Sequence, residues 1–250
     1  MAEGTAVALT GSAAAGQPGP AAHEPPLAAV LAGHERLSAL LTGLTDDDIR
    51  APSALPGWSR AHVLSHIEGI GRALARQARC AVRGELVEVY DGGRAVGRDA
   101  AIEAGSSRTA GELRRAVRDA LAEAESAWTA LGPGDWSLPV RYRDADARAA
   151  LLAWWRELEI HTADLLLGPG PRDWPRAFCG HALDFLAPRA PAAGLTLAAT
   201  DGPEERVHGA GSAVPVRGAL GDLTAWMAGR APSGPLDAGD GPLPALGPWP

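Results

Sequence analysis

The sequence predicts a mainly α-helical protein, a four-helix bundle followed by a small α+β C-terminal domain. Three observations lead to this prediction. Four long segments carry apolar residues at spacings of three and four, which is typical of amphipathic helices. The run Gly168–Pro171 ends this pattern, and short apolar runs separated by Gly, Pro and Asp follow it. We therefore expect a disordered arm over residues 1–26, the bundle over 27–170 and the small domain with a Pro/Gly-rich tail over 171–250.

The elements of the bundle follow from apolar spacing and from helix-start signals. Residues 1–26 contain few large side chains, so burial cannot offset the entropy lost on ordering them. Thr45 before three aspartates indicates a capped short helix, and Ser59 and Thr109 are candidate caps of long ones. The Gly-rich residues 84–107 are expected to be irregular. The four long helices are expected at about residues 27–41, 59–83, 109–131 and 146–167.

The second half has a different texture, with shorter elements and more turn residues. A helix is predicted near Pro175–Leu186, and a last helix over Leu220–Met227. Between them lie three strand-like runs, Leu195–Ala199, Arg206–His208 and Val214–Val216. Alternating helices and strands of this length predict a small α+β domain. The tail from residue 231 is expected to be held by Leu246 and Trp249.

Composition excludes several classes of function. All 23 basic side chains are arginines, which rules out a lysine Schiff base and a Walker-type phosphate loop. The net charge of −7 argues against nucleic-acid binding, and no run approaches the roughly 20 apolar residues of a membrane helix. Cys80 and Cys179 are too few for a disulfide framework or an all-cysteine zinc site. Without a secretory signal, the chain is expected to be cytoplasmic, with two reduced thiols.

Glu157 and His161 stand four residues apart on the fourth predicted helix, so their side chains project from one face. His66, on the second helix, is in phase with Val63 and Ile70 and is expected to face the bundle interior. Two histidines and one carboxylate are the ligands of an open catalytic zinc site, and other divalent metals accept them. The alternative is a solvated Glu–His pair, with the histidines serving as ordinary core residues.

Residues near this pair have competing interpretations. Asp164 is either a carboxylate that orients His161 or polar surface, and Glu159, out of phase, is expected to be a surface acid. Arg230, just after the last helix, could hold a carboxylate bidentately or be a solvated C-terminal arginine. Of Trp154 and Trp155, one must face the interior, where it packs in the core or walls a pocket.

The order of several motifs resembles the mycothiol-dependent maleylpyruvate isomerase family, whose N-terminal half is a DinB-like metal-binding bundle. The similarity runs from about residue 27 to the final Leu-Pro-Ala-Leu-Gly-Pro-Trp. The matching segments are Pro52–His66, Tyr90–Glu103, Arg156–Leu165, Leu195–Asp201 and Trp226–Arg230.

The resemblance implies a specific chemistry. It places His66, Glu157 and His161 on the zinc ligands of the family and Arg230 on an arginine that serves activity. The cosubstrate of the family is mycothiol, the small thiol of actinobacteria, and a coordinated thiol loses its proton at neutral pH. Its thiolate would add to the cis double bond of maleylpyruvate, allow rotation and leave again, giving fumarylpyruvate. The expected partners are thus a small-molecule thiol and an electrophile.

Three departures keep other functions open. Ile70 and Arg72 replace an Asn and an Asp of the family, and Trp154 replaces an arginine three residues before the metal glutamate. Apolar replacements favour a larger acceptor, such as a natural-product intermediate, and hence a mycothiol S-transferase or thiol-exchange enzyme. A non-catalytic metal-binding regulatory module is the further alternative. Neither metal identity nor oligomeric state follows from the sequence.

Overall fold

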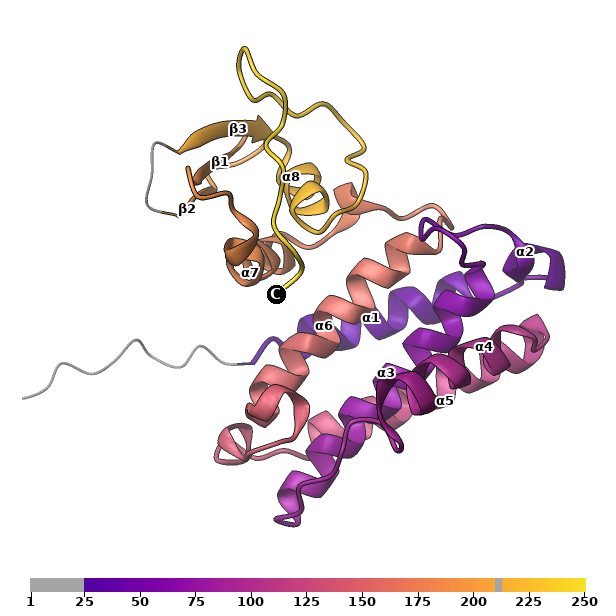
Figure 1. The fold of residues 1–250 in the computed structure, drawn as a ribbon. Coiled ribbons are helices and arrows are strands. Elements are labelled where there is room, and N and C mark those ends of the chain that lie inside the picture. Colours follow the sequence, from indigo (N-terminus) through magenta and orange to yellow (C-terminus); the bar gives the residue numbers. More distant parts are fainter. Residues whose placement is uncertain (1–24, 210–212) are drawn as a thin grey trace, which may run out of the picture.

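The computed structural model describes residues 25–209 and 213–250, and it is a helical bundle with a small sheet domain beside it (Figure 1). This confirms the predicted fold class. The predicted arm lies outside the described residues apart from Pro25 and Pro26. The long helices of the bundle are α1 (Leu27–Leu40), α3 (Arg60–Val82), α5 (Ala110–Thr129) and α6 (Ala147–Asp164).

Side-chain caps define where three helices of the bundle begin. Thr45 Oγ1 accepts a hydrogen bond from the Asp48 amide at the start of α2 (Asp46–Arg50), and Asp48 accepts one from the Thr45 amide. Thr109 and Glu112 form the same reciprocal pair at α5. At α6, Asp146 Oδ1 accepts from the Ala149 amide at 2.7 Å. Each cap stabilises its helix by about 1 kcal/mol, because it satisfies amides that the helix leaves unpaired.

The segment 84–107 is not irregular throughout, so that prediction is wrong in part. A π-helical turn over Arg94–Asp99 continues into a short helix, α4 (Ala100–Ser106), which packs on α3. Arg50 donates to the carbonyls of residues 106, 107 and 108, which holds the end of α4 from another helix. Because these bonds come from far along the chain, local composition did not indicate the helix.

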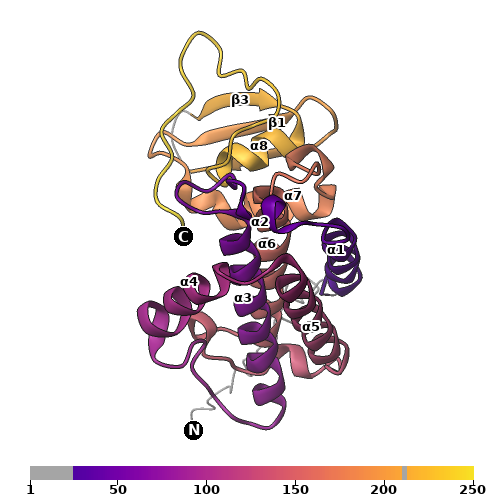
Figure 2. The ribbon, with the colours of Figure 1, turned by 90° about the vertical axis from the view of Figure 1, so that its right-hand side faces the viewer.

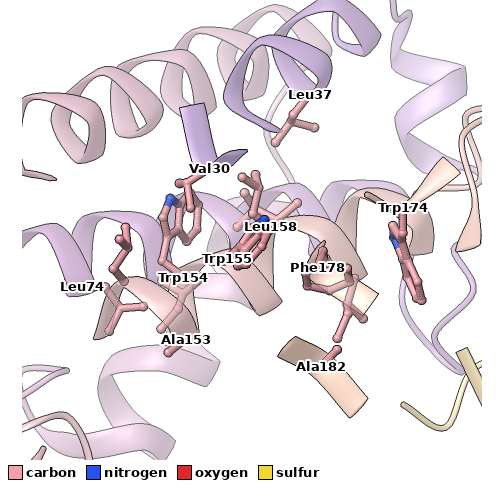
Figure 3. Close-up of a cluster of buried hydrophobic side chains, with 14 of the residues drawn as sticks. Val30, Leu37, Leu74, Ala153, Trp154, Trp155, Leu158, Trp174, Phe178 and Ala182 are labelled. Atoms are coloured by element: carbon pink, nitrogen blue, oxygen red, sulfur yellow. The ribbon is translucent and has the colours of Figure 1, made fainter. Parts of the chain in front are cut away.

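The core of the bundle is built around Trp154, which faces inward from α6 (Figure 3). Its Nε1 donates to His34 Nε2 of α1 at 2.8 Å. Gly71 of α3 faces the same indole: a Cβ there would lie 3.0 Å from Trp154 Cη2, closer than ordinary contact. Fully buried Leu74 and Leu158 fill the space around it, each stabilising the fold by about 1.5–3 kcal/mol. This packing brings α3 and α6 close together.

The small domain follows the predicted order of elements. Its helices are α7 (Arg176–Leu186) and α8 (Leu220–Met227), and its strands are β1 (Leu195–Ala199), β2 (Glu205–His208) and β3 (Val214–Gly218). The strand order is β2-β1-β3, with β1 antiparallel to β2 and parallel to β3. Leu197 pairs with Val216, and both are buried on the same side as Leu195.

The small domain lies against the bundle beside α6 (Figures 1 and 2). Trp174 Nε1 donates to the Glu159 carbonyl of α6 at 3.1 Å, and the rings of Trp155 and Phe178 meet edge to face at 5.4 Å. The tail is held as predicted: Leu246 is partly buried, and the ring of Trp249 lies 6.0 Å from that of Phe185. No described helix is long and apolar enough to cross a membrane.

Candidate metal centre

Two helices of the bundle bring together three side chains of the types that bind metals. His66 comes from the second turn of α3, and Glu157 and His161 come from successive turns of α6. Glu157 Oε2 lies 3.0 Å from His66 Nε2 and 3.2 Å from His161 Nε2. The two imidazole rings meet edge to face at 4.6 Å, and one donor atom of each residue lies within 4.8 Å of the others. The structure therefore brings together the three residues that the sequence singled out.

The surroundings favour an ionised Glu157 and a neutral His66, whereas His161 holds its proton more firmly. Burial disfavours a charged Glu157, but hydrogen bonds with His161 and His66 outweigh it and hold the pKa of Glu157 well below its usual range. Burial lowers the pKa of His66, so its imidazole is neutral at pH 7. Burial also acts to lower the pKa of His161, yet its bonds with Asp164 and Glu157 raise it overall. Two imidazoles around an ionised carboxylate are ligands that zinc and related divalent metals accept.

Asp164 fixes the orientation of His161, as one of the two interpretations of the sequence predicted. Its Oδ2 lies 2.8 Å from His161 Nδ1, and its side chain is 2 % exposed. A proton held on Nδ1 leaves the lone pair of Nε2 directed toward Glu157. Burial works against ionisation of Asp164, but bonds from Arg230 and His161 lower its pKa.

Arg230 reaches this site from the end of α8 and binds Asp164 with two parallel hydrogen bonds. Nε donates to Oδ1 and Nη2 to Oδ2, both at 2.8 Å, and Nη1 donates to the Ala228 carbonyl at 3.1 Å. The edge of the guanidinium that a substrate carboxylate would occupy thus faces Asp164. Arg230 still lines the cavity beside the metal residues, so a direct contact with substrate stays a prediction.

Two residues near the site do not belong to the three-residue cluster, and one of them, Glu159, is not where the sequence predicted. Glu159 is not a surface acid: it is 4 % exposed, pairs with Arg36 of α1, and burial raises its pKa. Glu159 does lie on a different face of α6 from Glu157, as predicted, but α1 covers that face. His62, one turn before His66, lies 2.7 Å from Ser59 Oγ and 3.5 Å from Glu103, outside the cluster.

A cavity of about 430 Å³ opens over the three side chains and is walled by both domains. Bundle residues such as Ile70 and Tyr90 form one side, and Phe185 and Trp249 of the small domain form another. Its volume is within the range of small-molecule sites, about 300–1,000 Å³. The metal residues are therefore accessible to a ligand the size of a metabolite.

Arg156 is a cavity residue that the sequence analysis did not single out. It is 8 % exposed, its guanidinium lies 3.6 Å from the centre of the Phe185 ring, and Nη1 lies 2.9 Å from His181 Nε2. Burial, followed by the charge of Arg156, lowers the pKa of His181 to about 4, so this partner is neutral. Among the described residues no carboxylate lies within ion-pair distance of Arg156. Burial lowers the pKa of Arg156, while Tyr142 and the charge of Glu157 favour its charged form. Because no carboxylate pairs with it directly, the guanidinium can receive an anionic group from a ligand.

Comparisons with known proteins agree with this arrangement. The family model described as the mycothiol maleylpyruvate isomerase N-terminal domain matches residues 30–166, and that for the C-terminal domain of the same family matches residues 173–248. The crystal structure of the mycothiol-dependent maleylpyruvate isomerase has a TM-score of 0.77 at 24% identity, covering 89% of this chain and 95% of that chain. A histidine-to-alanine mutant of that enzyme has a TM-score of 0.78 at 23% identity, with the same coverage. A search of curated proteins finds no match.

Proposed function

Because the chain belongs to the mycothiol maleylpyruvate isomerase family, we propose that it is a metal-dependent enzyme that uses mycothiol as thiol cosubstrate and converts maleylpyruvate to fumarylpyruvate. The observation that carries this proposal is the convergence of His66, Glu157 and His161 at a cavity walled by both domains. The donor set fits a divalent cation, with zinc as the first choice, because it combines two imidazole nitrogens with one ionised carboxylate.

The chain holds these ligands ready for a cation. His66 Nε2, His161 Nε2 and Glu157 Oε2 would bind it, and Asp164 keeps the proton of His161 on Nδ1. When bound, the cation would lower the pKa of a coordinated thiol so that mycothiol reacts as its thiolate. Three protein ligands leave a tetrahedral position for that thiol. Arg230 acts here as a positioning residue, because it holds Asp164 and not the reacting atoms.

The remaining steps belong to the substrate and to the cavity walls. The sulfur of mycothiol forms a bond to one alkene carbon of maleylpyruvate, and the π electrons move to the conjugated carbonyl as an enolate. The former double bond rotates, the enolate re-forms it, and the thiolate leaves with its electron pair, so nothing is consumed. Arg156 would hold one substrate carboxylate during the rotation, since its guanidinium lacks an acidic partner in the described structure.

The test measures metal content and turnover together. Zinc-loaded protein is incubated with mycothiol and maleylpyruvate, and fumarylpyruvate is followed by its absorbance. His66→Ala should lose bound zinc and turnover, whereas His62→Ala, one turn away on the same helix and outside the cluster, should keep both. No fumarylpyruvate at any concentration of zinc-loaded enzyme would end the isomerase proposal.

One observation favours a second function, a mycothiol S-transferase. Ile70 lines the cavity and is 5 % exposed, so an apolar wall lies beside the proposed ligand His66. A larger electrophile would contact this wall, and thiol addition without expulsion would leave a thioether. Mass spectrometry of the same incubations separates the two functions, since only the transferase accumulates a mycothiol adduct.

A further inference from the structure

We propose that this enzyme also accepts an electrophile that carries an apolar group, which occupies a side cavity between α3 and the segment 89–102. This inference rests on the proposed function, because it places the reacting part of the same molecule at His66, Glu157 and His161. It goes beyond that function in the class of substrate: besides maleylpyruvate, the site would accept an acid with a cis double bond and an aryl or alkyl substituent.

The side cavity has a volume of about 360 Å³ and adjoins the cavity over the metal residues. Five residues line both: His66, Ile70, Val89, Tyr90 and Arg98. A ligand held at His66 can therefore extend past Ile70 into the side cavity without crossing the backbone.

The side cavity exists because small residues repeat along one face of α3. Ser65, Gly69 and Ala73 are four residues apart and line it in succession, and Ala101 of α4 stands on the other wall. A Cβ placed on Gly69 would meet no heavy atom within 4 Å. The space above Gly69 is thus open for a ligand, and helix geometry does not require a glycine at this point.

The side cavity suits an apolar group although arginines border it. Four arginines line it. The guanidinium of Arg72 pairs with Glu123 at 2.8 Å, that of Arg76 with Asp91 at 2.9 Å and that of Arg98 with Asp99 at 2.5 Å, whereas Arg79 is exposed. Because the charged heads of the first three are engaged, they offer mainly their aliphatic stems to the cavity. Arg156, which has no carboxylate at ion-pair distance among the described residues, lies in the other cavity. The geometry therefore divides the ligand into a carboxylate end at Arg156 and an apolar end beyond Ile70.

The test compares two 4-oxo acids that differ only in this group, 3-benzoylpropanoate and 4-oxopentanoate. Neither has a carbon–carbon double bond to which a thiol could add. Their affinities for the zinc-loaded protein are measured by calorimetry. The phenyl compound should bind at least about tenfold more tightly, because its ring leaves water on binding. Gly69→Leu fills the cavity and should abolish that gain while leaving the affinity for 4-oxopentanoate unchanged. Gly111→Leu of α5 is the matched control, since its Cβ would meet only Arg115 at 4.0 Å, and it should change neither affinity.

Several outcomes decide the inference. Equal affinities in the wild type, or a phenyl gain that survives Gly69→Leu, would overturn it and would mean that the cavity holds only water. If Gly69→Leu does not fold, Ala101→Leu fills the cavity from an exposed position on the opposite wall and should abolish the phenyl gain in the same way. Turnover separates this inference from the proposed function, with cis-3-benzoylacrylate and maleylpyruvate as substrates in the presence of mycothiol. Phenyl-dependent binding with no turnover of either substrate would refute the function and leave the cavity assignment standing.

Discussion

Replacing Asp164 by asparagine tests whether this carboxylate positions His161, a proposed metal ligand. In the wild type, Oδ2 faces both His161 Nδ1 and Arg230 Nη2 at 2.8 Å, and Oδ1 accepts from Arg230 Nε at 2.8 Å. An asparagine has one oxygen and one amino group in the same places. Whichever way it turns, an N–H faces another N–H, from His161 or from Arg230. The imidazole of His161 then loses its fixed orientation.

The expected loss of zinc affinity is about 10- to 100-fold, which is the usual effect of removing a group that orients a metal ligand. That range corresponds to about 1.4–2.8 kcal/mol. The substitution should change zinc affinity because the imidazole of His161 contacts Asp164 through Nδ1 and Glu157 through Nε2. The side chain of Asp164 is 2 % exposed, so water cannot replace the lost bond easily.

The assay is a competition between the protein and a chelator for zinc, for the wild type, Asp164→Asn and Glu159→Gln. Glu159 is the matched control, a buried carboxylate on the same helix that pairs with Arg36 and not with a proposed ligand. We expect Glu159→Gln to lower stability and to leave zinc affinity within twofold. The reasoning is refuted if Asp164→Asn also stays within twofold, or if both variants weaken zinc binding equally.

Three further predictions follow from the charged contacts. Arg230→Met should lower the free energy of unfolding at pH 7 by about 3–5 kcal/mol in urea titrations, because it leaves Asp164 buried without its cation. The pKa of Asp164 is depressed in the fold, so the stability that its ion pair with Arg230 contributes is present above the unfolded pKa of about 3.9 and is lost as pH falls further. The difference in stability between the variant and the wild type should therefore shrink in acid, and a constant difference would contradict this prediction. Arg36→Met should show the same direction of change over a higher pH range, since burial raises the pKa of Glu159. Its deficit, up to about 3 kcal/mol, should grow from pH 4 to pH 7, and a flat profile would contradict the assignment. Arg156→Met should raise the KM for maleylpyruvate at least about tenfold at unchanged zinc content. Arg156→Lys should have a KM between those of Arg156→Met and the wild type. An unchanged KM in Arg156→Met would exclude binding of the substrate carboxylate by Arg156.

The sequence predicted those parts of the fold that depend on local patterns. Apolar spacing placed α3 and α6 to within a few residues, and caps such as Thr109 set the starts of helices. The same spacing put His66 on an inward face and Glu157 and His161 on one shared face of their helix. Together with the family resemblance, this is why the cluster could be proposed before its geometry was known. Periodicity relates each residue to its own helix axis, and that is enough for a site built from two adjacent helices.

Local sequence patterns could not predict contacts between segments that are far apart in the sequence. Glu159 is buried because α1 covers it, and nothing in the sequence of α6 indicates which helix lies on that face. Arg156 becomes a candidate receptor only when α7 brings His181 and Phe185 to its guanidinium. The bond between Arg230 and Asp164 joins residues 66 positions apart in two domains. In each case the partner, and not the residue itself, decides the role.

The division of the site between two domains has a physical consequence for its chemistry. All three proposed ligands lie on the bundle, yet Asp164, which orients His161, is compensated by Arg230 of the small domain. If the small domain moved away, Asp164 would keep its charge without this partner, and its negative field would act on His161 alone. Without the two hydrogen bonds from Arg230, Asp164 could turn, and His161 would lose the partner that directs its Nε2 toward Glu157. Docking of the small domain and loading of the metal are therefore expected to be coupled, each stabilising the other by the same free energy.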